Sequence, residues 1–90
     1  MPYIKQEDRV YFDNMFENLP ELKTKGELEY CIFYLMKGYM TNRDFNYSNL
    51  HDTVYAAQHC VDEYRRRFLD VREDAAREKN GDIWTANLNT

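Results

Sequence analysis

The residues of this 90-residue chain that could carry metal chemistry are two histidines and several carboxylates. His51 and His59 are eight positions apart, about 12 Å along a helix, which is too far for both to bind one metal ion. His59 with Asp62 or Glu63 offers two ligands on one helical face, a spacing that is common by chance. No third ligand lies nearby, so we predict no metal site and no bound cofactor.

Acidic pairs raise the alternative of a metal-dependent nucleotide hydrolase. All-α nucleotide pyrophosphohydrolases hold Mg²⁺ with the motifs E-E-x-x-E and E-x-x-D on neighbouring helices. The first motif is absent here, because ELEY at 27–30 does not replace it, and Asp70 with Glu73 forms only a D-x-x-E. This function ranks third among our hypotheses, and we name no catalytic residue.

Nucleophilic catalysis has no visible apparatus either. Cys31 and Cys60 have neither a neighbouring histidine nor a CxxC partner, and a reactive thiol needs such a neighbour. Two cysteines are too few for a disulfide framework, so we expect buried free thiols. The single glycine in TKGE, at 24–27, does not make a phosphate-binding loop.

Tyrosines at helical spacing give a more concrete alternative, a pocket that stacks a nucleotide or another small ring. Residues of this kind are more often core or interface residues whose hydroxyls reach water. The tyrosines concerned are Tyr30, Tyr34, Tyr39, Tyr47, Tyr55 and Tyr64. A small-ligand or nucleotide-binding oligomer is therefore our second hypothesis.

The arginine run in DEYRRRFLDVRED, at 62–74, resembles a phosphate grip only at first sight. Residues 62–78 hold five arginines and six acidic residues, and affinity for a phosphate backbone needs a surplus of positive charge. Acid and arginine recur four positions apart, which is the spacing of ion pairs on a helix. The expected pairs are Asp62–Arg66, Glu63–Arg67, Arg66–Asp70 and Glu73–Arg77. We interpret the run as a solvated helix face.

Composition points the same way. The net charge is −4, so we predict no nucleic-acid partner. No apolar run approaches the roughly 20 residues of a membrane span, and the start MPYIKQEDR has no signal-peptide pattern. We therefore expect a cytoplasmic protein that does not bind membranes.

Three glycines and two prolines leave few helix breakers, which favours an all-α chain. We predict one domain over 1–90, a three-helix bundle with helices at about 6–18, 25–40 and 49–79 and an irregular tail at 82–90. Asp13 could break the first helix by capping a second one. Thr24 and Glu27 fit a capping box, and the second helix, apolar over most of its circumference, should be central.

The third predicted helix carries an apolar stripe that alternates steps of four and three residues, as in helix–helix seams. Ser48 or Asn46 is available as its cap, and Gly81 is placed for a left-handed C-cap. Trp84 should fold back on an apolar surface, and the last few residues should fray. The apolar stripe comprises Leu50, Val54, Ala57, Val61, Tyr64, Phe68, Val71 and Ala75.

The length of this helix predicts self-association. Roughly 31 helical residues span about 46 Å, whereas a compact 90-residue domain measures roughly 30 Å across. The apolar stripe continues beyond that limit and needs a cover, for which a second copy of the chain is the simplest partner. We expect a homodimer through the third helix; the alternative is a monomer whose first helix or tail covers the stripe.

Several stretches of the sequence resemble a family of small all-helical proteins of phages and bacteria, a domain of unknown function. The stretches are PYIKQEDR, TKGELEY, NYSNLHD, EYRRRF and EKNGDI, which together span Pro2 to Ile83. The resemblance implies a phage or prophage setting, and hence the cytoplasm of an infected cell. Family members often have proline where this chain has Asn14, so a break near Asp13 should be softer here.

Our leading hypothesis is a non-enzymatic accessory protein that acts as a homodimer and binds a host or phage protein through its helical surface. The apolar stripe is the candidate interface. No catalytic, cofactor-binding or metal-ligating residue is predicted.

Overall fold

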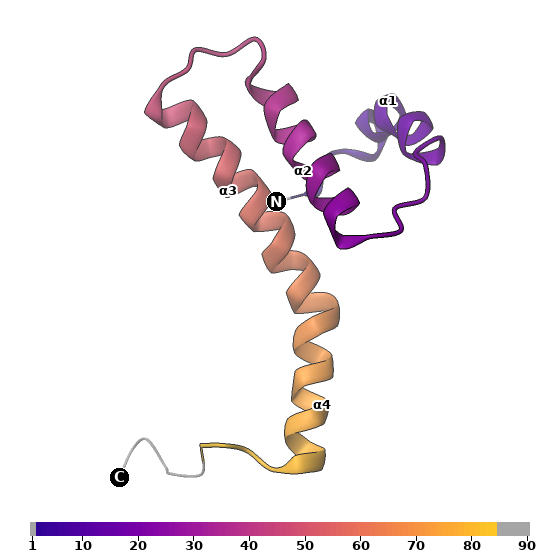
Figure 1. The fold of residues 1–90 in the computed structure, drawn as a ribbon, viewed down its shortest axis with the longest axis vertical. Helices are drawn as coiled ribbons and strands as arrows, with labels where there is room; N and C mark the ends of the chain where they lie inside the picture. The colour runs from indigo at the N-terminus through magenta and orange to yellow at the C-terminus, as the bar shows by residue number, and fades with distance from the viewer. Residues whose placement is uncertain (1, 85–90) are drawn as a thin grey trace. The chain divides into compact units, whose positions relative to one another are not determined.

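A computed structural model describes residues 2–84 of the chain (Figure 1). These residues form helices and no strand: α1 (Gln6–Glu17), α2 (Lys25–Met40), α3 (Tyr47–Tyr64) and α4 (Asp70–Asn80). A π-helical turn, η1 (Arg65–Leu69), joins α3 to α4, so one helical segment of 34 residues ends the fold. The all-α class, the three helical segments and the long last helix are confirmed.

The chain divides into two compact units, and the boundary falls inside α3. Residues 1–60 contain α1, α2 and most of α3, whereas the unit from residue 61 contains the end of α3, η1 and α4. The prediction of a single domain over 1–90 stays a prediction. In the described part of the chain, no helix combines the length and the apolar character that crossing a membrane requires.

Helix α1 runs without interruption through Asp13, so the expected break near that residue is wrong. Acidic Glu7 and Asp8 lie in its first turn, where the helix dipole stabilises negative charge. At the other end, the Asn18 side chain donates to the backbone oxygen of Asn14 at 2.7 Å. Pro20 follows two residues later and cannot continue the helix.

Helix α2 begins with the predicted capping box. The Thr24 hydroxyl accepts from the Glu27 backbone N–H at 3.1 Å, and the Glu27 carboxylate accepts from the Thr24 N–H at 3.1 Å. The same carboxylate accepts from the Lys23 N–H at 2.6 Å. Three backbone donors at the start of the helix are thus satisfied by two side chains.

Helix α3 begins two residues earlier than expected, and Asn46 rather than Ser48 caps its first turn. The Asn46 side-chain oxygen accepts from the backbone N–H of Asn49 at 2.9 Å. The Asn49 amide in turn donates to the backbone oxygen of Asp44 at 2.9 Å. These two contacts hold the preceding loop against the helix start, which explains why the helix includes Tyr47.

Helix α4 ends at Asn80, and Gly81 follows at the C-cap position that the sequence predicts. Gly81 has φ of +90° and ψ of 148°, so φ is positive as in a C-cap glycine while ψ is extended rather than left-handed helical. Its N–H donates to the Arg77 oxygen at 2.8 Å. Trp84 is exposed instead of folded back, and the predicted fraying of the last residues lies outside the described residues.

Apolar side chains are not enclosed by this chain alone. Among the described residues, no apolar side chain is buried, and Thr53 is the single buried residue, with 7 % of its surface exposed. The expected central position of α2 is therefore wrong for the single chain, because its side chains are exposed or half-buried. The prediction of buried thiols is also wrong. Both cysteines are free, but Cys31 is half-buried and Cys60 is exposed.

Candidate self-association surface

The apolar stripe lies mostly open on the surface of α3, η1 and α4. Its least exposed large member is Leu50, with 38 % of its surface accessible, and Ala57 is half-buried. The unit from residue 61 holds the more open part, where 55 % of Phe68 and 60 % of Val71 are exposed. Whether all eight stripe residues meet a partner stays a prediction.

Two aromatic rings are in contact where α3 passes into η1. The ring centroids of Tyr64 and Phe68 are 4.9 Å apart, with their planes tilted by 56°. Aromatic pairs in tilted geometry stabilise each other beyond their area of contact. The pair therefore presents a joined, exposed apolar surface at the start of η1.

The arginine run forms η1, a turn that periodicity did not predict. The backbone N–H of Asp70 donates to the oxygen of Arg65, five residues earlier, instead of the four that an α-helix uses. A π-turn holds one residue more than an α-turn. The helix positions that follow are therefore rotated by about 100° from where an uninterrupted α-helix would place them.

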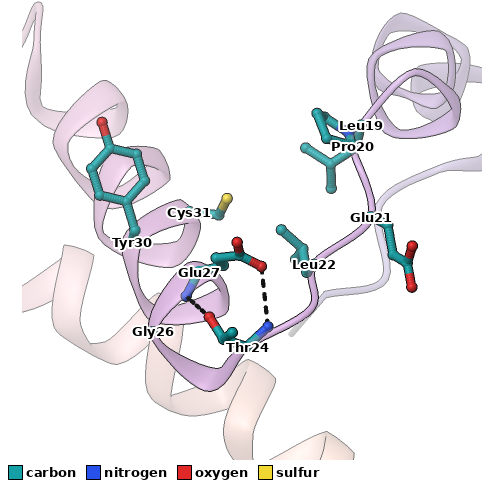
Figure 2. A pocket seen from close by; sticks show the side chains of 9 residues that line it. All are labelled: Leu19, Pro20, Glu21, Leu22, Thr24, Gly26, Glu27, Tyr30 and Cys31. Carbon is teal, nitrogen blue, oxygen red and sulfur yellow. Dashed lines mark hydrogen bonds between the residues drawn. The ribbon is translucent and has the colours of Figure 1, made fainter.

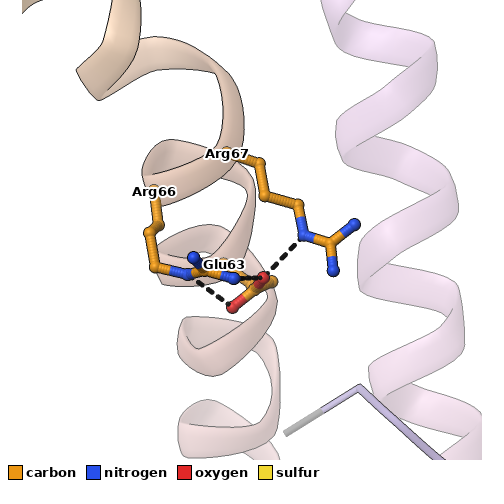
Figure 3. A network of polar contacts seen from close by, with 3 residues as sticks. All are labelled: Glu63, Arg66 and Arg67. Carbon is orange, nitrogen blue, oxygen red and sulfur yellow. Dashed lines mark hydrogen bonds and ion pairs between the residues drawn. The ribbon is translucent and has the colours of Figure 1, made fainter.

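Glu63 holds two of the three arginines (Figure 3). Its carboxylate accepts from Arg66 Nη2 at 2.5 Å and from Arg67 Nε at 2.7 Å. Only 18 % of the Glu63 side chain is exposed. The predicted pair Glu63–Arg67 is confirmed, and Arg66 shares the same acid at a spacing of three residues.

Further along α4, Arg77 pairs with Asp74 at 3.7 Å and with Asp82 at 4.0 Å. Arg77 therefore pairs with Asp74, three residues before it, whereas we predicted a pair with Glu73. These pairs are solvent-exposed and each contributes little to stability. The interpretation of the arginine run as an ion-paired helix face agrees with these contacts.

The family to which the sequence is similar is shown by direct comparison. The family described as Domain of unknown function (DUF6899) matches residues 1–83. The chain belongs to this family. The match covers the three helical segments and η1, so the helical architecture above describes the family's domain in this chain. No curated protein and no solved structure matches the chain.

Metal-ligating groups do not gather in the described part of this DUF6899 domain. No set of three or more His, Cys, Asp or Glu side chains lies close enough to hold a metal ion there. His51 and His59 instead stand in a row of rings along α3. This row is the feature of the domain that our sequence reasoning missed.

The row of rings follows the spacing of four residues along one face of α3. The ring centroids of Tyr47 and His51 are 5.3 Å apart, those of His51 and Tyr55 4.2 Å, and those of Tyr55 and His59 6.0 Å. Side chains four positions apart are neighbours on a helix, so the order Tyr, His, Tyr, His in the sequence was the available signal. The contacts between these rings join successive turns of the helix.

A shallow recess lies in the unit 1–60, where the link after α1 meets the start of α2 (Figure 2). Its volume is about 500 Å³, and the Thr24–Glu27 capping box forms part of its wall. Of the tyrosines considered for a ligand pocket, Tyr30 lines this recess, and its ring stacks on that of Tyr34 at 6.3 Å. The Cys31 thiol also borders the recess.

Proposed function

We propose that this DUF6899 domain is a non-enzymatic accessory protein that works as a homodimer through its third helical segment. The observation that carries the proposal is the exposure of every large apolar residue of the apolar stripe in the single chain. Exposed apolar surface of this kind marks a protein–protein interface. Charged residues, by contrast, form ion pairs on the same segment.

The direct test is the mass of the native protein and of Phe68→Asp, measured by light scattering at micromolar concentration. We expect the unaltered chain to have twice the mass of a 10.9 kDa protomer and the variant to be monomeric, because the new charge lies in the stripe. Ile83→Asp is the matched control, since Ile83 is fully exposed beyond the end of α4. A variant Phe68→Asp that stays dimeric contradicts the assignment of the interface.

A setting in a phage or prophage, in the cytoplasm of the infected cell, belongs to this proposal and rests on the family resemblance. A host or phage protein is then the further partner of the dimer. Affinity capture with the dimer, compared with capture by the Phe68→Asp monomer, tests this part. A partner captured equally by both would argue against the dimer surface as its binding site.

A small-ligand function is the second candidate, and the recess beside Tyr30 favours it. Its volume of about 500 Å³ lies in the range of ligand pockets, roughly 300–1,000 Å³. Thermal unfolding with a panel of nucleotides tests it, with Tyr30→Ala as the variant that removes the ring. A rise in melting temperature that Tyr30→Ala abolishes would favour this candidate over the accessory role.

A further inference from the structure

We infer that Asn80 is a site of spontaneous deamidation, a covalent change whose rate is set by the opening of the last turn of α4. Asn80 is the last residue of α4, and Gly81 follows it at the C-cap position. Both residues belong to the unit from residue 61. The inference concerns this unit alone and does not depend on the proposed homodimer.

Deamidation joins the asparagine side chain to the backbone nitrogen of the next residue. The Gly81 nitrogen gives its proton to solvent hydroxide and attacks the side-chain carbon Cγ of Asn80. A cyclic succinimide forms, water returns the proton, and ammonia leaves from Cγ. Water then opens the ring, at Cγ to give aspartate or at the main-chain carbonyl carbon to give isoaspartate. The net change replaces an amide NH₂ by OH and needs only water.

The residue after Asn80 favours this reaction at Asn80 over the other asparagines. Asn80 is the one asparagine of the sequence that is followed by glycine. Any other residue would place a Cβ beside the attacking nitrogen, and glycine has none. A Cβ added to Gly81 would meet nothing within 4 Å, so the space beside this nitrogen is open. Asn80 is itself exposed, and water therefore reaches both reacting groups.

The folded end of α4 opposes the reaction. The Gly81 N–H donates to the Arg77 oxygen at 2.8 Å, so the proton that must leave is held in a hydrogen bond. Asn80 also has the helical backbone conformation of α4. The ring closes only after the backbone of Asn80 rotates out of that conformation. Deamidation therefore proceeds from a chain in which the last turn has opened.

The contacts that close this turn are weak, so the open form is accessible in the folded protein. Arg77 lies 3.7 Å from Asp74 and 4.0 Å from Asp82, and exposed ion pairs of this kind contribute little to stability. Helix ends open with free energies near zero, whereas core elements open only with the whole fold. Asn80 is thus protected in part, and its protection is local to the end of α4.

The product weakens the same helix end. A carboxylate at residue 80 lies at the C-terminus of α4, where the helix dipole disfavours negative charge. It also competes with Asp74 and Asp82 for Arg77, the cation that both acids approach. Isoaspartate inserts an extra carbon into the main chain before Gly81 and displaces the N–H that reaches Arg77. Deamidation is therefore a one-way release of the last turn of α4.

The test follows the full chain during incubation at mildly alkaline pH, folded and unfolded in guanidinium chloride. Peptide mapping by mass spectrometry measures the conversion of each asparagine. Asn42 is the internal reference, because it is exposed in the loop after α2 and is followed by Arg43. In the folded chain we expect Asn80 to convert at least about tenfold faster than Asn42, since no Cβ hinders its attacking nitrogen. We expect Asn80 to convert more slowly in the folded chain than in the unfolded one.

Ala76→Gly tests the control by the helix end, because it weakens α4 and leaves Asn80 and Gly81 unchanged. We expect Asn80 of the folded variant to convert about two- to fivefold faster, with no change in guanidinium chloride. Ala56→Gly is the matched control, since it makes the same change in α3 and should leave the rate at Asn80 unaltered. Asn80→Gln should show no conversion at residue 80, because its longer side chain would have to close a larger ring.

The outcomes decide between local control and its absence. Selective conversion of Asn80 that folding slows and Ala76→Gly accelerates supports the inference. An Asn80 that stays intact in the folded chain while it converts in guanidinium chloride overturns it. Equal rates in the folded and unfolded chains, with no effect of Ala76→Gly, also overturn it, because the end of α4 would then have no part in the rate.

Discussion

The backbone N–H of Asp70 donates to the carbonyl oxygen of Arg65, five residues earlier in the chain. The π-turn that this contact closes contains Arg66 and Arg67, the two arginines that pair with Glu63. Turns of this kind are rare inside α-helices and are found often at functional sites. Here the turn changes which residues of α4 follow the direction of Tyr64 and Phe68.

Deletion of Arg65 should leave the homodimer intact. Removing one residue turns the π-turn into an α-turn, and the residues after it keep their directions because the inserted position is the one removed. Deletion of Asp62 is the control, since it rotates Tyr64 and Phe68 by about 100° relative to Val61. We expect an unchanged mass by light scattering for the first deletion and a loss of dimer for the second. A dimer lost on deletion of Arg65 and kept on deletion of Asp62 would contradict an interface that depends on the directions of Val61, Tyr64 and Phe68.

Glu63→Ala should destabilise the protein by about 1 kcal/mol, because two charge-assisted hydrogen bonds are lost and two guanidiniums are left beside each other. Arg66→Ala and Arg67→Ala should each cost about half as much, since Glu63 keeps one partner in either variant. Urea unfolding followed by circular dichroism measures all three. Equal stability of Glu63→Ala and the unaltered protein would show that the pairs do not hold the turn.

Gly81→Ala and Gly38→Ala form a pair of identical changes with opposite expected signs. Gly81 has φ of +90°, which an alanine adopts only with strain, so we expect a loss of about 1 kcal/mol. Gly38 lies within α2, and an added Cβ meets nothing within 4 Å. Alanine there should raise the free energy of unfolding by about 0.5–1 kcal/mol. Thermal unfolding measures both, and a stabilising Gly81→Ala would contradict the described end of α4.

Thr24→Ala should cost about 1 kcal/mol, because it removes the hydroxyl that accepts from the Glu27 N–H. Thr24→Ser keeps that acceptor and should restore most of the stability. The helical signal in circular dichroism during thermal unfolding reports the difference. If serine and alanine destabilise equally, the capping box does not limit the stability of α2.

The start of α2 could be predicted from sequence because the partners of its cap, Thr24 and Glu27, are three residues apart. The ends of the helices near Pro20 and Gly81 were also predictable, because the backbone preference of a single residue determines each of them. The exposure of Cys60 and Trp84 was not predictable, since the burial of a side chain depends on which other elements or chains cover it.

The π-turn could not be predicted from periodicity. Leu50 to Ala75 fits a heptad pattern without interruption, and nothing in that pattern marks the extra residue of η1. Ala75 and Ala76 illustrate this, because either can continue the surface of Phe68. The row of Tyr47, His51, Tyr55 and His59, by contrast, was visible as a spacing of four. It was missed because the tyrosines were considered for a ligand pocket and the histidines for a metal site.

The most direct measurement of the central claim is the native mass of the unaltered protein at tens of micromolar. Self-association through the last helical segment predicts a species of twice 10.9 kDa that Phe68→Asp converts to a monomer. A species of 10.9 kDa that persists as concentration is raised would contradict it, because the exposed stripe would then have no second copy to cover it.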